Sequence, residues 1–311
     1  MRKFEKSLLT KNIYKAHFAL LLANIIYGAN YIIAKGIMPD KIGPSAFVFI
    51  RLICGTILFW LVKSFIKEKI NRKDLPQLIL CGFLGAAANQ LLFFHGINLT
   101  SPIDASIIMT ITPAIVLVFS FFILKESITP RKLLGISIGS IGAITLILYG
   151  NNSGGTSSVL GNLLVILNAS CYGLYLVVVK PLMRKYKAIT VISWVFLFGF
   201  IFILPFGFND FISTDFAAFD TNTYLVIGFV VLFTTFFAYL FNIYALNFVL
   251  PSTNSSYIYL QPAINFIMVS IYSYVLLRDD YAQDISLLKI LCCLLVIIGI
   301  YLLSKTPKKV H

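Results

Sequence analysis

Two stretches of this sequence decide its fold: residues 98–115, NLTSPIDASIIMTITPAI, and residues 247–264, NFVLPSTNSSYIYLQPAI. Both stretches carry Asn, Pro, Ser and Pro-Ala-Ile in the same order, and each member of the second set follows its counterpart by 149 positions. Self-similarity at a fixed period indicates an internal repeat. A second pattern recurs with an offset of 145 positions, where Tyr27-Gly28, Lys35 and Met38 match Tyr172-Gly173, Lys180 and Met183. The chain is therefore expected to consist of two related halves.

Strongly apolar segments surround both stretches. Hydrophobic residues make up 59% of the 311 residues and charged residues only 12%, against about 25% charged in soluble domains. A bilayer is crossed by about 20 apolar residues, and in lipid such a segment is helical because its backbone must satisfy its own hydrogen bonds. The expected fold is all-α integral membrane, with ten transmembrane helices as two five-helix repeats, and the odd number makes the second repeat inverted. The expected spans are residues 16–35, 45–66, 75–95, 102–124, 132–150, 159–180, 188–208, 223–246, 252–277 and 286–304.

The distribution of Lys and Arg predicts the orientation of these spans. With the N-terminus inside, 20 basic residues fall on the cytoplasmic side and 4 on the outer side, with Arg51 inside a span. Cytoplasmic loops carry the excess of basic residues in membrane proteins, so both termini are expected in the cytoplasm and the chain in the cell (inner) membrane. The expected organisation is a cytoplasmic N-terminus (1–15), a first repeat (16–150), a second repeat (151–304) and a cytoplasmic tail (305–311).

Several functions are excluded by composition and motif. The net charge of +13 lies in short clusters between apolar runs rather than on a folded basic face, which argues against nucleic-acid binding. The five cysteines lie inside apolar runs without metal-site or disulfide spacing: Cys54, Cys81, Cys171, Cys292 and Cys293. A P-loop, a zinc motif and a catalytic triad are all missing from the sequence. We therefore expect no enzyme activity, no cofactor and no metal.

The first half resembles a known family. The stretch from Phe94 to Pro102, FHGINLTSP, is followed by Pro113, by Leu124-Lys125-Glu126 and by glycines at 135, 139 and 142. This arrangement resembles an EamA domain, and the second half resembles another, so the chain is similar to the ten-span members of the drug/metabolite transporter superfamily. The second half departs from the pattern, because its acidic residue (Asp279 or Asp280) comes about one turn later and only Gly299 remains of the glycines. The resemblance implies a transporter, and several members of the superfamily export amino acids and related metabolites.

Polar and aromatic residues recur at helical spacing inside the spans, and Asn168 extends one of these stripes by a turn. Polar groups in hydrocarbon turn inward, towards partners or a water-filled cavity. The alternative is interhelical hydrogen bonding, at about 0.6 kcal/mol each. We expect a central substrate cavity that contains no fixed charge and is lined by Tyr27, Asn30, Gln90, Ser106, Thr110, Tyr172, Tyr175, Tyr239, Asn242, Tyr259 and Asn265.

Five further residues have two interpretations each. Pro113 and Pro262 interrupt equivalent spans and act either as hinges or as packing kinks. Arg51 and Asp104 either form an ion pair on the outer side or have separate structural roles, Asp104 then belonging to a helix start capped by Ser101. His95 either couples transport to protons or is structural.

These features together predict a secondary transporter, by resemblance an exporter or exchanger. It moves a small neutral or zwitterionic metabolite such as an amino acid by alternating access. The alternatives are a membrane enzyme acting on lipids, a non-transporting structural or sensory subunit, and a flippase of a lipid-linked substrate. The expected partners are a small-molecule substrate and the lipid bilayer, and the oligomeric state stays open.

Overall fold

The computed structural model describes residues 2–131 and 158–275, with isolated positions between 133 and 145 and between 287 and 298. Within these residues the chain is helical and contains no strand. Seven helical stretches of the described part are long and apolar enough to cross a membrane: Asn12–Lys35, Pro44–Ser64, Arg72–Leu99, Pro102–Leu124, Val159–Met183, Ala188–Ser213 and Thr221–Ala245.

These seven stretches agree closely with seven of the ten expected spans. The span expected at 252–277 is helical from Pro251 to Val275, although it is interrupted and is not among the seven. The spans expected at 132–150 and 286–304 lie almost entirely outside the described residues. A helical membrane protein is therefore confirmed for the described residues, and the number ten stays a prediction.

The elements follow the order of the expected spans, and several spans consist of consecutive helical pieces of different geometry. The first half contains α1 (Arg2–Lys35), α2 (Pro44–Ser64), η1 (Arg72–Asp74), α3 (Leu75–Gly82), η2 (Phe83–Ala87), α4 (Ala88–Leu99), α5 (Pro102–Ile108), η3 (Met109–Ile111) and α6 (Thr112–Leu124). The second half contains α8 (Val159–Met183), α9 (Ala188–Ser213), η5 (Phe216–Ala218), α10 (Thr221–Phe229), η6 (Val230–Phe237), α11 (Ala238–Ala245), α12 (Pro251–Ser256), η7 (Tyr257–Tyr259) and α13 (Leu260–Val275).

Prolines set the start of three of these helices. Pro44, Pro102 and Pro251 each occupy the first helical position, where proline loses no hydrogen bond and its fixed φ suits the helix. At α5 the Ser101 hydroxyl also accepts a hydrogen bond from the Asp104 amide at 3.0 Å, which is the N-cap interaction that the sequence suggested.

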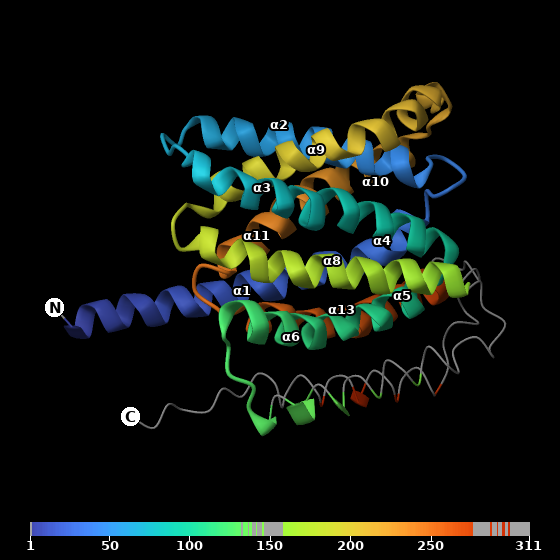
Figure 1. Cartoon of the computed structure of the whole chain (residues 1–311). Helices are drawn as coiled ribbons and strands as arrows, with labels where there is room; N and C mark the ends of the chain where they lie inside the picture. Colours follow the sequence, from blue (N-terminus) through green and yellow to red (C-terminus); the bar gives the residue numbers. More distant parts are fainter. Residues whose placement is uncertain are drawn as a thin grey trace.

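Helices from the two halves pack against each other throughout the molecule (Figure 1). α2 lies along α9, α4 along α8, and α1 against α11 and α13. In addition, α5 packs against α13 and α12 packs against α6. One interrupted span consists of α5 and α6, and the other consists of α12 and α13. Because the first piece of each span contacts the second piece of the other, the two spans run antiparallel.

Glycines allow a close contact between α4 and α8. A Cβ added at Gly96 would lie 2.8 Å from Val165 Cγ2, and one added at Gly161 would lie 2.8 Å from the backbone carbon of Leu99. Small residues at such contacts let membrane helices approach closely, because packing rather than hydrophobicity drives their association. The contact between α4 and α8 positions two walls of the site described below.

Departures from α-helical geometry recur at equivalent places in the two halves. η2 and η6 are π-helical segments, and η3 and η7 are 3₁₀ segments that directly precede the turns containing Pro113 and Pro262. Proline removes one backbone donor, and π-helical turns are frequent at functional sites. The helices are therefore interrupted at both prolines, whereas a role of these prolines as hinges stays a prediction.

Candidate functional site

A buried cavity lies where the helices of the two halves meet. Its volume is about 70 Å³, counted as space for the centres of water molecules, which is room for several waters. The lining is polar and aromatic, and it consists of Tyr27, Asn30, Tyr31, Arg51, Asn89, Gln90, Phe93, Phe94, Met109, Asn168, Tyr172, Thr234, Tyr239, Ile258 and Gln261.

Five of the eleven proposed substrate residues line this cavity: Tyr27, Asn30, Gln90, Tyr172 and Tyr239. They come from α1, α4, α8 and α11, which are parts of four different spans brought together by tertiary packing. All except Tyr27 are less than 9% exposed, so these side chains lie inside the protein.

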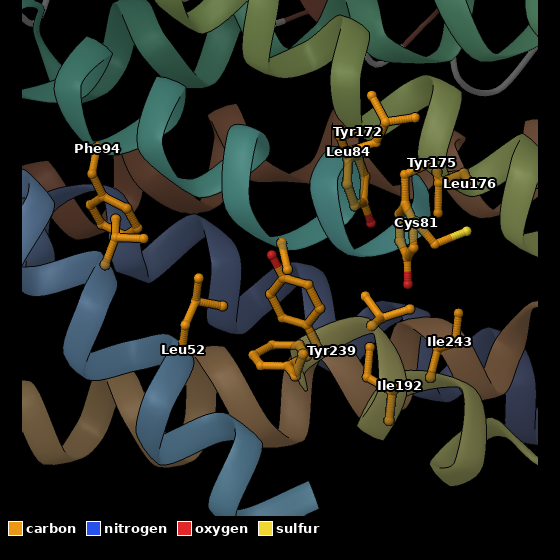
Figure 2. Packing of buried hydrophobic residues seen from close by; sticks show 14 of the residues in the cluster. Leu52, Cys81, Leu84, Phe94, Tyr172, Tyr175, Leu176, Ile192, Tyr239 and Ile243 are labelled. Atoms are coloured by element: carbon orange, nitrogen blue, oxygen red, sulfur yellow. The ribbon is translucent and has the colours of Figure 1, made fainter. Parts of the chain in front are cut away.

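The Tyr239 hydroxyl connects two walls of the cavity. It donates towards Gly85 O at 3.3 Å and Asn89 Oδ1 at 3.2 Å, and it accepts from Gln90 Nε2 at 3.4 Å. In Figure 2, Tyr239 points upward from the lower part of the view, and Tyr172 and Tyr175 point downward from the upper part. These hydrogen bonds link α11 to η2 and α4.

The other six proposed residues are buried but do not belong to the lining, and four of them interact with the backbone or with cavity residues. Ser106 and Thr110 donate to the backbone carbonyls three residues before them, at 2.7 and 2.6 Å. Asn242 donates to the Tyr172 hydroxyl at 2.7 Å and so supports a cavity residue from behind. Asn265 donates to Pro102 O at 2.7 Å and joins the two interrupted spans.

The last two of these six are aromatic. Tyr175 packs against Gly85 and lies next to Tyr172, with ring centroids 6.1 Å apart. Tyr259 is only 1% exposed and lies in the 3₁₀ segment η7. Both residues are part of the packing around the cavity rather than of its surface.

Arg51 changes the expected chemistry of the site. It lies seven residues after the first residue of α2, or about 10 Å along the helix at 1.5 Å per residue, and it is only 3% exposed. Arg51 Nε donates to Thr235 Oγ1 at 2.9 Å, and its Cζ lies 4.5 Å from the centroid of the Phe94 ring. The guanidinium lines the cavity, so the expectation of a lining without fixed charge is wrong.

Arg51 and Asp104 do not form the ion pair that the sequence suggested. In the described part of the chain the hydrogen-bond partner of Arg51 is Thr235, and Asp104 belongs to the capped start of α5. His95 shares a hydrogen bond with Ser45 at 3.0 Å, outside the cavity lining. The partner of Arg51 thus comes from η6, in the second half of the chain.

Four buried acceptors of the lining have no hydrogen-bond partner among the described residues: Asn30 Oδ1, Gln90 Oε1, Asn168 Oδ1 and Thr234 Oγ1. Native proteins pair nearly all of their buried polar atoms, and each exception asks for an explanation. The feature that the four atoms share is that their residues all line one cavity.

Some lining residues could not be found from helical periodicity. Asn89 and Gln90 are neighbours in sequence, yet both line the cavity, whereas neighbours on a regular helix point about 100° apart. They follow the π segment η2, and Thr234 lies within the π segment η6. A π turn contains an extra residue and so rotates the helix face, an effect that hydrophobic periodicity does not reveal.

The chain belongs to the EamA-like transporter family, whose model matches residues 14–148 and again residues 159–305. Two copies of one family unit account for the repeat in the sequence, and family membership makes the protein a membrane transporter and not an enzyme. This confirms the resemblance stated from the sequence.

Similar proteins support the same assignment. The chain is 26% identical to the uncharacterized transporter YetK of Bacillus subtilis over 74% of this chain and 71% of that protein. It is also 26% identical to an uncharacterized transporter of Archaeoglobus fulgidus, over 85% of this chain and 90% of the relative. A probable terminal-alkyne amino-acid exporter of Streptantibioticus cattleyicolor is 25% identical over 61% of this chain and 63% of the exporter.

The fold resembles that of a protein of known crystal structure. The TM-score is 0.67 at 13% sequence identity, and the likeness covers 95% of this chain and 98% of the other. At this identity the likeness concerns the fold alone.

Proposed function

We propose that this chain is a secondary transporter that moves a small amino-acid-like metabolite through the central cavity by alternating access. The observation that carries the proposal is the cavity deep within the helices, which is lined by polar and aromatic side chains. Tyr27 lies eight residues before the end of α1 at Lys35, or about 12 Å along the helix, and Tyr172 lies in the middle of α8. A substrate site near the midplane between two repeats is typical of secondary transporters.

The proposed mechanism uses two repeats that are inverted relative to each other. In support, the contact of α1 with α11 has its repeat equivalent in the contact of α8 with α4, and the two interrupted spans pack antiparallel. In inverted repeats, rocking of one unit against the other exposes a fixed site first to one side of the membrane and then to the other. The segments around Pro113 and Pro262 are the proposed hinges, because the helix is already interrupted there.

The proposed substrate class rests on the lining. Amide groups and tyrosine hydroxyls can replace the water around a small polar solute, and aromatic rings can pack against its apolar part. The named activity of the Streptantibioticus relative, amino-acid export, agrees with this class and favours outward transport. We also propose that the protein lies in the cell (inner) membrane, with both termini in the cytoplasm.

Counterflow into proteoliposomes tests this function. Proteoliposomes that contain the purified protein are loaded with one unlabelled solute, and uptake of the same solute in labelled form is measured. The solutes are phenylalanine, threonine, a phosphosugar and a polyamine. We expect uptake of an amino acid that falls at least about tenfold in Tyr172→Ala, because this ring forms part of the cavity and such losses accompany removal of a large aromatic contact. Tyr224→Ala, at an exposed position, is the matched control.

The other outcomes separate the alternatives. Uptake of only the phosphosugar or the polyamine, unchanged in Tyr172→Ala, would contradict both the site and the substrate class. Absence of counterflow for every solute would instead favour a structural or sensory subunit, and movement of a lipid-linked probe alone would favour a flippase.

A further inference from the structure

Arg51 is a buried cation without a carboxylate partner in the cavity. The guanidinium has five N–H donors, and the structure pairs its Nε with Thr235 Oγ1 at 2.9 Å. The lining, as the described residues define it, contains no Asp or Glu. Arg51 lines the cavity, and its Nε bond to Thr235 leaves the two terminal nitrogens available for a further contact. Several N–H donors of one positive charge are therefore available at the cavity.

The position of Arg51 is held on two sides. Thr235, which accepts from Nε, itself donates to Val230 O at 3.0 Å across the π-helical turn of η6. On the other side the Phe94 ring packs against the guanidinium at 4.5 Å, a cation–π contact. Since both neighbours are buried, the fork of terminal N–H groups is preorganised, which suits the bidentate binding of a carboxylate.

The same cavity also carries a set of acceptors. Asn168 Nδ2 donates to Asn89 O at 2.7 Å, and Gln90 Nε2 donates towards the Tyr239 hydroxyl at 3.4 Å. These bonds orient both amides so that Asn168 Oδ1 and Gln90 Oε1 remain without partners, as does Asn30 Oδ1. Carbonyl oxygens in such positions accept hydrogen bonds from an ammonium or amine.

We propose that Arg51 is the carboxylate-binding residue of this cavity, and that the amide oxygens of Asn30, Gln90 and Asn168 bind the amino group of the same ligand. The ligand class is therefore an α-amino acid in its zwitterionic form, with an apolar or aromatic side chain packed against the ring-lined wall. This inference rests on the proposed transport function and deepens it, because it selects zwitterions from the wider class of small neutral and zwitterionic solutes.

The charge count in the lining separates this class from others. A single cation balances one carboxylate, whereas a phosphate dianion would leave a net negative charge buried at a depth where unpaired charge is strongly disfavoured. A polyamine would be repelled by Arg51 and would find no carboxylate in the described lining. Of these three ligand classes, only a zwitterion brings both a negative group for the guanidinium and a set of N–H donors for the amide oxygens.

Ligand binding to the purified full-length protein tests the assignment without transport. Calorimetry compares L-phenylalanine with its amide, which lacks the carboxylate, and with 3-phenylpropionate, which lacks the amino group. The variants are Arg51→Gln and Arg51→Lys. Lys63→Gln is the control, because it removes a cation from the opposite end of the same helix, where Lys63 donates to Glu68 O. Thermal unfolding and size-exclusion chromatography establish that each variant is folded.

We expect the wild type to bind L-phenylalanine about 10- to 100-fold more tightly than its amide, the range for a charge-assisted contact. Arg51→Gln should abolish this preference while the affinity for the amide stays within about twofold. Arg51→Lys should retain part of the preference, because it keeps the charge but loses the planar fork. Lys63→Gln should resemble the wild type, and Asn168→Ala should weaken phenylalanine binding more than phenylpropionate binding.

Equal affinity of the wild type for phenylalanine and its amide, or a preference that persists in Arg51→Gln, would overturn the assignment. Absence of binding of all three compounds to folded wild-type protein would overturn it as well. Binding with the expected preference but without counterflow would refute transport and leave the role of Arg51 intact. Counterflow of phenylalanine that is unchanged in Arg51→Gln would support transport and overturn the role of Arg51.

Discussion

At the scale of single residues, the shape of the cavity depends on what lies opposite each aromatic ring. A Cβ added at Gly85 would lie 2.4 Å from Tyr175 Cδ2 and 2.6 Å from its Cγ, so the absence of a side chain at Gly85 creates the space for this ring. Tyr175 in turn packs beside Tyr172 of the lining. A glycine outside the cavity thus determines where a cavity wall lies.

Gly85→Ala should therefore destabilise the protein and disturb the site. Overpacking of a close contact typically costs about 1–3 kcal/mol, and we expect a lower midpoint of thermal unfolding in detergent together with weaker substrate binding. Gly228→Ala is the control, because a Cβ at that position meets no atom within 4 Å and alanine favours the helix. Equal stability of the two variants would contradict the close contact.

Tyr239→Phe tests the hydroxyl that connects the cavity walls. The substitution keeps the ring but leaves Asn89 Oδ1 without its donor and removes a contact of Gln90, which should cost about 1–3 kcal/mol. We expect a lower unfolding midpoint and slower counterflow. Tyr224→Phe loses a hydroxyl bonded to Phe216 O on the exposed surface and should behave like the wild type.

At the scale of helices, two repeat-related lysines donate hydrogen bonds to backbone carbonyls at the ends of equivalent helices. Lys35 Nζ donates to Thr100 O between α4 and α5, and Lys180 Nζ donates to Val249 O, at 2.8 Å, and to Leu246 O between α11 and α12. The last carbonyls of a helix have no intrahelical partner, and a cation there also interacts favourably with the helix dipole. The recurrence of Lys35 at Lys180 in the sequence therefore corresponds to a shared structural role.

Lys180→Met should loosen the connection between α11 and α12. Hydrogen bonds from charged groups contribute about 1.5–3 kcal/mol, so we expect a clear decrease in the midpoint of thermal unfolding. Lys187→Met serves as the control and should have little effect, because Lys187 is exposed in the connection between α8 and α9. A midpoint of Lys180→Met within experimental error of the wild type would show that these contacts do not stabilise the junction.

At the scale of the whole molecule, the charge distribution predicts the topology. The count of 20 basic residues inside against 4 outside predicts that both termini lie in the cytoplasm. In a cysteine-free background, single cysteines at either terminus should react with a membrane-impermeant maleimide only after the cells are permeabilised. Ser213→Cys, at the exposed last residue of α9, should react in intact cells. Labelling of either terminus in intact cells would contradict the predicted topology.

The amino-acid sequence by itself determined the membrane fold and its repeat. Hydropathy over about 20 residues is a local property, so the seven described spans agree with their expected positions within a few residues. The pattern shared by the segments around Pro113 and Pro262 likewise predicted equivalent interruptions, which are the 3₁₀ segments η3 and η7.

Only the tertiary structure decided which polar residues face the cavity. Ser106 and Thr110 shared a helical stripe, yet they bond to their own backbone, because nothing in that stripe specifies which neighbouring helix covers it. Arg51 faces the cavity because Thr235, from the other half of the chain, holds its guanidinium there. Such contacts join residues far apart in sequence, and the π segments rotate helix faces, so spacing along the chain cannot encode them.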